Sequence, residues 1–229
     1  PAKGRSTRFP GKNLAQIDGI PLLGYVITAA KQSNIFEVIM VSTDDETIAT
    51  VARKYGASVR GRPANLTADD VQLKPVIEDA VAELKFTRDK VLGSETNKYV
   101  AIILPTAALL TPKDIVSIWE KFHKGKARAD GIMAITRPME HPLGALNRVN
   151  SYLAPHFGVD IPQSQKWPKL WMDAGAVYMY SVEAFKKHGF YTPYLLGYKL
   201  PRHKVVDVNY PEDLLLLEAL MEYRNQTVV

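Results

Sequence analysis

The chain has 229 residues, 46% of them hydrophobic and none of them cysteine. This composition suits one α/β domain with a full core, and it excludes a disulfide framework and thiolate catalysis. The formal net charge is +5, but the cations are spread along the chain without interleaved aromatic residues, so we expect an anionic small substrate and no nucleic acid. No membrane span or signal peptide is visible, which predicts a cytoplasmic protein.

The first thirteen residues contain two glycines, two prolines, two hydroxyl side chains and four cations. Backbone N–H groups, hydroxyls and Lys or Arg side chains hold phosphates, and glycine lets the backbone approach a ligand closely. A disordered basic terminus is the alternative, but core sequence (Leu14, Ile17, Ile20) follows at once. We therefore predict a nucleotide-phosphate loop over residues 1–13. Because such loops normally follow a strand, we also expect a strand before Pro1.

Strand-like and helix-like segments alternate along the rest of the chain. Asp44 and Asp45 suit a helix N-cap and first turn, and Pro112 and Pro211 suit first turns. Strands buried on both faces with helical crossovers predict an α/β fold with a doubly wound, mostly parallel, Rossmann-like sheet in a single domain, 1–229. The predicted strands are 38–42, 99–104, 131–136, 176–180 and 205–209, and the predicted helices are 23–33, 45–55, 74–84, 112–123 and 211–223.

Two segments interrupt this alternation. Residues 85–98 are polar and are predicted to form a surface connection. Residues 137–170 hold five prolines and show little periodicity, and they are too many for an ordinary loop. We expect a strand-rich excursion that leaves the sheet, returns at Trp171, and covers the active site or a partner subunit.

Residues 1–13 resemble the signature loop of the sugar cytidylyltransferases, which make CMP-activated 3-deoxy-2-keto sugar acids. Residues 6–12 look like the branch that acts on the lipopolysaccharide sugar KDO, but Asn13 stands where that branch usually has proline and favours sialic-type acids. Segments 41–48, 62–69, 76–81, 104–106 and 207–213 match the family in order, so the resemblance covers nearly the whole chain. It implies a nucleotide-diphospho-sugar transferase fold. The matches to the sialic branch within the loop are Pro1, Ala2, Ser6, Pro10, Lys12 and Asn13.

Two segments refine the expected substrate. Asp173-Ala174-Gly175 resembles the pseudaminic-acid enzymes, and residues 105–110 lack the pattern typical of the N-acetylneuraminate enzymes. The resemblance thus implies coupling of CTP to a nine-carbon sugar acid of the pseudaminic or legionaminic type, with N-acetylneuraminate close behind. KDO transfer remains an alternative. A nucleotide-sugar-binding homologue without turnover is another, because Leu73 stands where relatives carry a hydroxyl residue and Asn209 stands where they carry an aspartate.

The reaction brings two polyanions together, so positioning and electrostatic stabilisation do most of the work. The resemblance assigns Lys12 to the α-phosphate and Arg8, with Lys3 and Arg5, to the β- and γ-phosphates. Lys3 stands where the sialic branch has arginine. For Arg62 a buried ion pair is a nearly equal alternative. The expected catalytic residues are Lys12, Arg8 and Asp207, and the expected CTP-binding residues are Ala2, Lys3, Gly4, Arg5, Ser6, Thr7, Asn13, Arg62 and Asp69.

Magnesium is the expected cofactor. Mg²⁺ usually takes one or two carboxylates together with substrate phosphates. The family's Asp-x-Asp is matched by Asp207 and Asn209, which would share one face of the predicted strand 205–209. The alternative is that both side chains merely cap the helix predicted at Pro211.

The resemblance also implies residues for the sugar acid and a homodimer. Thr106, Arg148, Asp173 and Tyr178 are expected to bind the sugar, with His141 as a weaker candidate. Relatives are commonly dimers in which the excursion reaches the neighbour. His123 and His188 are predicted simply to end helices.

Overall fold

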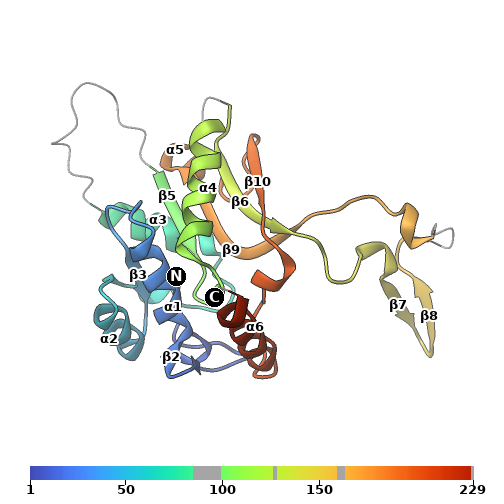
Figure 1. The fold of residues 1–229 in the computed structure, drawn as a ribbon, viewed down its shortest axis with the longest axis horizontal. Coiled ribbons are helices and arrows are strands. Elements are labelled where there is room, and N and C mark those ends of the chain that lie inside the picture. The colour runs from blue at the N-terminus through green and yellow to red at the C-terminus, as the bar shows by residue number, and fades with distance from the viewer. Residues whose placement is uncertain (85–98, 126–127, 159–162, 228–229) are drawn as a thin grey trace.

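The computed structural model describes residues 1–84, 99–125, 128–158 and 163–227 (Figure 1). The prediction for 85–98 lies outside these residues. The main sheet has four strands in the order β10-β6-β9-β5. Strand β6 is parallel to β10, and β9 is antiparallel to both β6 and β5, so β5, β6 and β10 point the same way. The four strands are β5 (Tyr99–Ile103), β6 (Gly131–Thr136), β9 (Met172–Ser181) and β10 (Leu195–Lys199).

The remaining strands form pairs. Strands β3 (Met40–Thr43) and β4 (Ser58–Gly61) are parallel. Strands β1 (Gln16–Ile17) and β2 (Ile20–Pro21) form an antiparallel hairpin. The mixed α/β class with parallel pairs is therefore confirmed, whereas β1, β2, β4 and β10 were not predicted.

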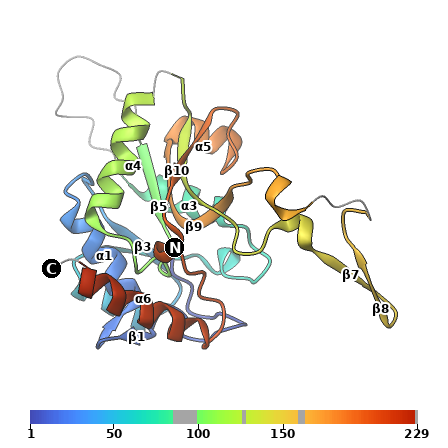
Figure 2. The ribbon, with the colours of Figure 1, turned by 45° about the vertical axis from the view of Figure 1, so that its right-hand side comes forward.

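Helices cover both faces of the main sheet (Figure 2). On one face, Ile115, Ile118 and Phe122 of α4 pack against Ile132 and Met179. On the other face, the sheet packs against α3 and α5, and these buried side chains include Ile77, Val81, Met133, Tyr178, Tyr180 and Phe185. The helices are α1 (Leu22–Gln32), α2 (Glu46–Lys54), α3 (Leu73–Glu83), α4 (Pro112–Gly125), α5 (Val182–His188) and α6 (Asp213–Thr227), with short 3₁₀ turns at Lys12–Leu14, Ala64–Leu66, Pro142–Gly144, Ser164–Lys166 and Arg202–Lys204.

Helix termini largely follow the sequence signals. Asp45 is the N-cap of α2, where its carboxylate accepts the Ile48 N–H at 2.9 Å. Pro112 begins α4, and His188 ends α5. Pro211 was predicted in a first turn, but it lies two residues before α6. There, Asp213 accepts the backbone N–H of both Asn209 and Tyr210.

The strand predicted at 205–209 is wrong, because this segment pairs with no strand of the described chain. Its apolar character has another cause. Val208 is fully buried against Leu217 and Met221 of α6 and against Ile17 and Leu22. A valine-rich segment that packs on helices carries the same composition as a buried strand.

Residues 137–171 form the predicted excursion. It leaves the sheet after β6 and returns at β9, and it carries the antiparallel hairpin of β7 (Leu146–Val149) and β8 (Tyr152–Pro155). The hairpin projects away from the body of the molecule in both views (Figures 1 and 2). Among the described residues, no helix is both long and apolar enough to cross a membrane.

Candidate functional site

The N-terminal loop, residues 62–76 and the segment after β5 line an open cleft. An adjoining recess includes Gly4 and Asp44. Ala2, also predicted, is buried beneath the loop rather than exposed to the cleft. The structure thus brings together most residues that the sequence assigned to the nucleotide. These are Lys3, Arg5, Ser6, Thr7, Arg8, Lys12, Asn13, Arg62 and Asp69, with Thr106 from the expected sugar set.

Two hydrogen bonds fix the loop against the body, and a third links its two ends. The Ala2 N–H donates to the Ser42 carbonyl at 2.9 Å, and the Gly4 N–H donates to the Asp44 carboxylate at 2.8 Å. The Asn13 amide donates to the Lys3 carbonyl at 2.9 Å. A Cβ on Gly4 would lie 2.7 Å from the Asp45 Cβ, so only glycine allows this close approach. The sequence predicted Asp44 only as a helix-cap carboxylate. No sequence pattern indicated that this carboxylate would also accept a hydrogen bond from the loop.

An ion pair crosses the cleft between the loop and the opposite wall. The Lys3 ammonium pairs with the Asp69 carboxylate. The Lys3 side chain is 25% exposed and that of Asp69 is 65% exposed, so the pair lies at the solvent boundary. Both residues were predicted to bind CTP, and a triphosphate entering the cleft would compete with Asp69 for Lys3.

Arg62 projects from the wall next to β4. Its guanidinium donates to the Ser42 carbonyl at 2.9 Å. Burial lowers the pKa of Arg62, and the nearby carboxylates of Asp44 and Asp79 oppose that effect. The alternative prediction for Arg62 was a buried ion pair, and in the described chain Arg62 does not form one. Its neighbour Arg60 makes that pair instead, with two contacts of 3.0 Å to Asp79.

Lys12 lies at the end of the loop, in a 3₁₀ turn. Its ammonium donates to the Val208 carbonyl at 3.0 Å. Burial lowers the pKa of Lys12, and the Asp207 carboxylate opposes this effect. The contact therefore joins the N-terminal loop to the segment that carries Asp207 and Asn209, which is distant in sequence.

The lowered pKa of Lys12 predicts a pH effect. If protonated Lys12 is needed for CTP, then kcat/KM for CTP should fall as the pH rises through a pKa below that of a free lysine. In a Lys12→Arg variant the guanidinium stays protonated throughout this range. Its basic limb should therefore move to higher pH, whatever its absolute rate. Identical basic limbs in both proteins would contradict this assignment.

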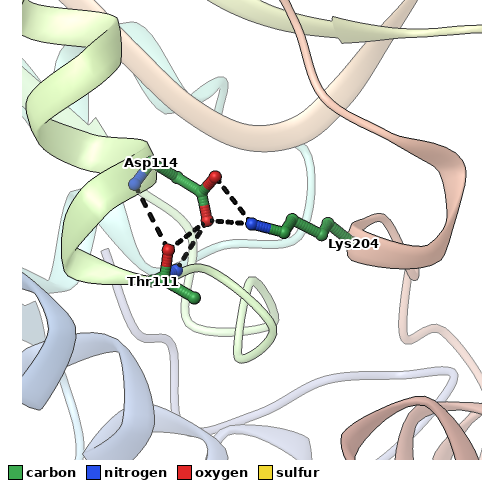
Figure 3. Close-up of polar contacts among 3 residues, drawn as sticks. All are labelled: Thr111, Asp114 and Lys204. Atoms are coloured by element: carbon green, nitrogen blue, oxygen red, sulfur yellow. Dashed lines mark hydrogen bonds and ion pairs between the residues drawn. The ribbon is translucent and has the colours of Figure 1, made fainter. Parts of the chain in front are cut away.

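A polar network fixes the start of the segment that carries Asp207 (Figure 3). Asp114, at the start of α4, accepts hydrogen bonds from the N–H and hydroxyl of Thr111. The Lys204 ammonium contacts both Asp114 carboxylate oxygens at 2.8 Å. Asp114 is largely buried. Lys204 lies three residues before Asp207, so this network holds one end of the segment, and the hydrogen bonds that Asp213 accepts from Asn209 and Tyr210 hold the other.

We predict that Lys204→Met destabilises the protein and impairs the site. Removing one member of a buried, hydrogen-bonded pair costs about 3 kcal/mol, because the other charge is left unpaired. Lys204→Arg should recover most of the loss in unfolding free energy, measured by urea denaturation. Lys121→Met, which removes an exposed ammonium contact to the Gly197 carbonyl, is the control. A Lys204→Met protein as stable as this control would refute the prediction.

Asp207 and Asn209, the residues expected to bind the metal, offer one carboxylate and one amide. In the described part of the chain, no group of three or more His, Cys, Asp or Glu side chains is arranged to hold a metal. The segment offers the exposed carboxylate of Asp207 and the amide oxygen of Asn209. In the described chain no side-chain hydrogen bond joins Asp207 or Asn209 to α6; the first residue of that helix, Asp213, instead accepts the backbone N–H of Asn209 and of Tyr210. One carboxylate and one amide fit a Mg²⁺ ion held mainly by substrate phosphates.

Of the residues expected to bind the sugar, Asp173 and Tyr178 lie together on β9, whereas Arg148 lies on the hairpin. Tyr178 is buried and donates to both oxygens of Asp173 at 2.9 Å, and the Gly175 N–H donates to one of them at 2.8 Å. Burial, reinforced by Asp173, raises the pKa of Tyr178 strongly, so it stays protonated and remains a donor. The Leu104 N–H donates to the Ala176 carbonyl, which places this region of β9 beside the cleft wall.

Arg148 does not join the other expected sugar residues. It lies exposed on the hairpin, and its guanidinium donates to the Asn150 carbonyl two residues away. His141 also stays within the excursion, where it contacts the Pro168 carbonyl and the Trp167 ring. Within one subunit, the structure therefore does not support the assignment of Arg148 to the sugar.

The comparisons with known proteins define the class and then the family. One solved structure, a CMP:2-keto-3-deoxy-manno-octonic acid synthetase complexed with CTP, has a TM-score of 0.66 at 16% identity, and the match covers 98% of this chain and 97% of that one. A cytidylyltransferase from Leptospira borgpetersenii has a TM-score of 0.61 at 16% identity, over 96% of this chain and 84% of its own. The fold is thus that of the nucleotide-diphospho-sugar transferases.

Sequence similarity extends this assignment to the family. Residues 1–145 match the family model described as cytidylyltransferase. The pseudaminic acid cytidylyltransferase of Campylobacter jejuni is 30% identical over 99% of this chain and 96% of its own length. The CMP-N,N'-diacetyllegionaminic acid synthase of Legionella pneumophila is 27% identical over 100% of this chain and 97% of its own. The chain belongs to the cytidylyltransferase family and is a nucleotidyltransferase.

Proposed function

We propose that this enzyme couples CTP to a nonulosonic acid of the pseudaminic or legionaminic type and releases pyrophosphate. The cleft carries the proposal, because it gathers the loop cations Lys3, Arg5, Arg8 and Lys12 with Arg62 around one space. The names of the full-length relatives support the choice of acid. Similarity to the octonic acid synthetase concerns the fold alone, and it does not favour that sugar.

The loop cations suit the chemistry of this transfer. The anomeric hydroxyl of the acid attacks the α-phosphorus and loses its proton, a new O–P bond forms, and the bond to pyrophosphate breaks. Negative charge grows on the phosphoryl oxygens and on the leaving group. Lys12 would stabilise the α-phosphate, with Arg8 and Arg5 on the leaving pyrophosphate. The apolar wall of Leu66, Val71 and Leu73 would contact the cytidine.

We also propose that Mg²⁺ assists the reaction. Asp207 would hold the ion together with the triphosphate, and Asn209 would contribute its amide oxygen. When bound, the ion withdraws negative charge from the phosphoryl oxygens. The protein's own part is to hold Asp207 near Lys12, through the Lys12–Val208 and Lys204–Asp114 contacts.

The third part of the proposal is that the enzyme is a homodimer and that it acts in the cytoplasm. The hairpin exposes apolar side chains that a lone subunit leaves in water: Leu146 (56% exposed), Val149 (53%), Tyr152 (79%) and Leu153 (67%). Large exposed apolar patches mark interaction sites. A second copy that covers the hairpin would bury them.

The dimer has a direct test. Replacing Tyr152 and Leu153 together by glutamate should convert a dimer into a monomer in light scattering after gel filtration, because charges cannot be buried unpaired at the interface. Glutamate at Tyr191, which is 75% exposed elsewhere, is the matched control and should leave the mass unchanged. A monomeric wild-type protein at assay concentration would refute the homodimer.

The catalytic proposal is tested by pyrophosphate release from CTP. The acceptors are pseudaminic acid, N,N'-diacetyllegionaminic acid, N-acetylneuraminic acid and KDO, each with and without Mg²⁺. We expect release with the first or second acid and little with KDO. Tight CTP binding without release, whatever the acid, would instead indicate a binding protein without turnover.

A further inference from the structure

Two cations share one exposed indole beside the neck of the excursion. The guanidinium carbon of Arg137 lies 4.7 Å from the Trp171 ring centroid, and the Lys199 ammonium lies 5.5 Å from it. Trp171 is 41% exposed. In the described chain, neither cation has an acidic partner within ion-pair distance. Two cations near one ring, with no acid to pair with, form a positive patch that favours a bound anion.

Strand register places this cluster at the edge of the sheet where the cleft opens. Ile135 of β6 pairs with Lys199 of β10 and with Asp173 of β9. Arg137 and Trp171 are each two residues further toward the excursion. The strands β5, β6 and β10 run in the same direction, so the carboxyl ends of β6 and β10 share an edge with the end of β5.

The cluster also shares a face with the cleft wall. Ile135, Leu73 and Leu104 pack against the same buried cluster, which includes Tyr178, and both of these leucines line the cleft. Side chains two residues apart, or paired across strands, lie on the same face of a sheet. Lys199 is therefore on the face of Ile135, and Arg137 and Trp171 continue that row beyond the strand ends.

One strand, β9, separates the cluster from the cleft wall. Neighbouring strands are about 4.8 Å apart, and β6 ends at Thr136, opposite Met172, further toward the excursion than β5, which ends at Ile103, opposite Val177. A long arginine side chain spans part of this distance. An acceptor that reaches from the α-phosphate across β9 would meet the Asp173–Tyr178 pair first and the two cations next.

We propose that Arg137 and Lys199, held over Trp171, bind the carboxylate of the acceptor sugar acid. This inference rests on the proposed function and deepens it. The carboxylate is attached to the carbon that bears the attacking hydroxyl, so holding it orients that hydroxyl toward the nucleotide. The cluster takes the role that Arg148 was expected to have.

The test measures equilibrium binding, independently of turnover. Pseudaminic acid and N,N'-diacetyllegionaminic acid are titrated calorimetrically into the wild-type protein and into Arg137→Gln, Lys199→Gln and Lys169→Gln variants. Lys169 is an exposed cation of the same segment, and its variant is the control for net charge. We expect the Kd of the acid to rise about 10- to 100-fold in the first two variants, with the Kd of CTP unchanged. Arg137→Lys should retain part of the affinity.

A neutral probe isolates the anion. The carboxamide of the same acid should bind the wild-type protein and both Gln variants alike. Equal losses for the acid and its carboxamide, losses no larger than in Lys169→Gln, or a wild-type protein that binds neither acid would overturn the proposal. Pyrophosphate release by the wild-type protein reports separately on the proposed function. Acid binding that depends on Arg137 without any release would support the subsite and reject the reaction.

Discussion

Replacing Lys12 by methionine is expected to lower kcat by roughly 10²–10³-fold, because the reacting phosphate loses a preorganised positive charge. The protein should still fold, since the side chain makes one hydrogen bond to a backbone carbonyl. Burial disfavours the charge of Lys12, so an apolar side chain of similar length costs little there. The measurement is pyrophosphate release at saturating CTP and acid.

Lys54→Met is the matched control. Lys54 is exposed in the last turn of α2, and its variant removes the same charge away from the cleft. Its kcat should equal that of the wild-type protein. A Lys12→Met enzyme within a few-fold of this control would contradict the role of Lys12 at the α-phosphate.

Replacing Asp207 by asparagine is the second change with a large expected effect. The variant has two neutral amides, at positions 207 and 209, and no carboxylate to hold the metal. Metal-assisted stabilisation of the transition state, which contributes several kcal/mol, should therefore decrease. We expect about a 100-fold loss of activity at fixed Mg²⁺, partly restored by raising the Mg²⁺ concentration. The measurement is the dependence of the initial rate on Mg²⁺.

Glu212→Gln is the control for Asp207→Asn, since Glu212 is an exposed acid five residues further along the chain. The reciprocal variant, Asn209→Asp, should lower the Mg²⁺ concentration needed for half-maximal rate. An unchanged Mg²⁺ requirement in both Asp207→Asn and Asn209→Asp would show that this segment does not hold the ion.

Local sequence signals predicted most of the fold. Helical periodicity and the Asp45 cap gave the first residue of five helices to within about two residues, although α6 ends at Thr227 rather than 223 and α5 was not predicted as a helix. Buried strands such as Gly131–Thr136 followed from their composition. Segments without such signals were missed. Strand β4 is half exposed and carries one branched apolar residue, Val59. The antiparallel insertion of β9 between β5 and β6 depends on tertiary pairing, which local pattern does not encode.

Some residues of the candidate site could likewise be predicted from the sequence, and others could not. Its loop is contiguous in sequence, so the composition of residues 1–13 predicted it, and the family resemblance assigned roles to Lys3 and Lys12. Asp44 was missed because its carboxylate accepts a backbone N–H from forty residues away. Arg137 and Lys199 were missed because sixty-two residues separate them, and only the pairing of β6 with β10 brings them together.

The cations of this cleft are proposed to serve the transfer of CMP from CTP to a nonulosonic acid. The ³¹P NMR spectrum of a reaction of CTP, pseudaminic acid, Mg²⁺ and the wild-type enzyme tests this transfer. We predict that the three CTP resonances are replaced by one phosphodiester resonance and one pyrophosphate resonance, the latter with twice the integral because pyrophosphate has two equivalent phosphorus atoms. The Lys12→Met enzyme should leave CTP intact over the same time. CTP that stays unchanged with pseudaminic and legionaminic acids alike would contradict it.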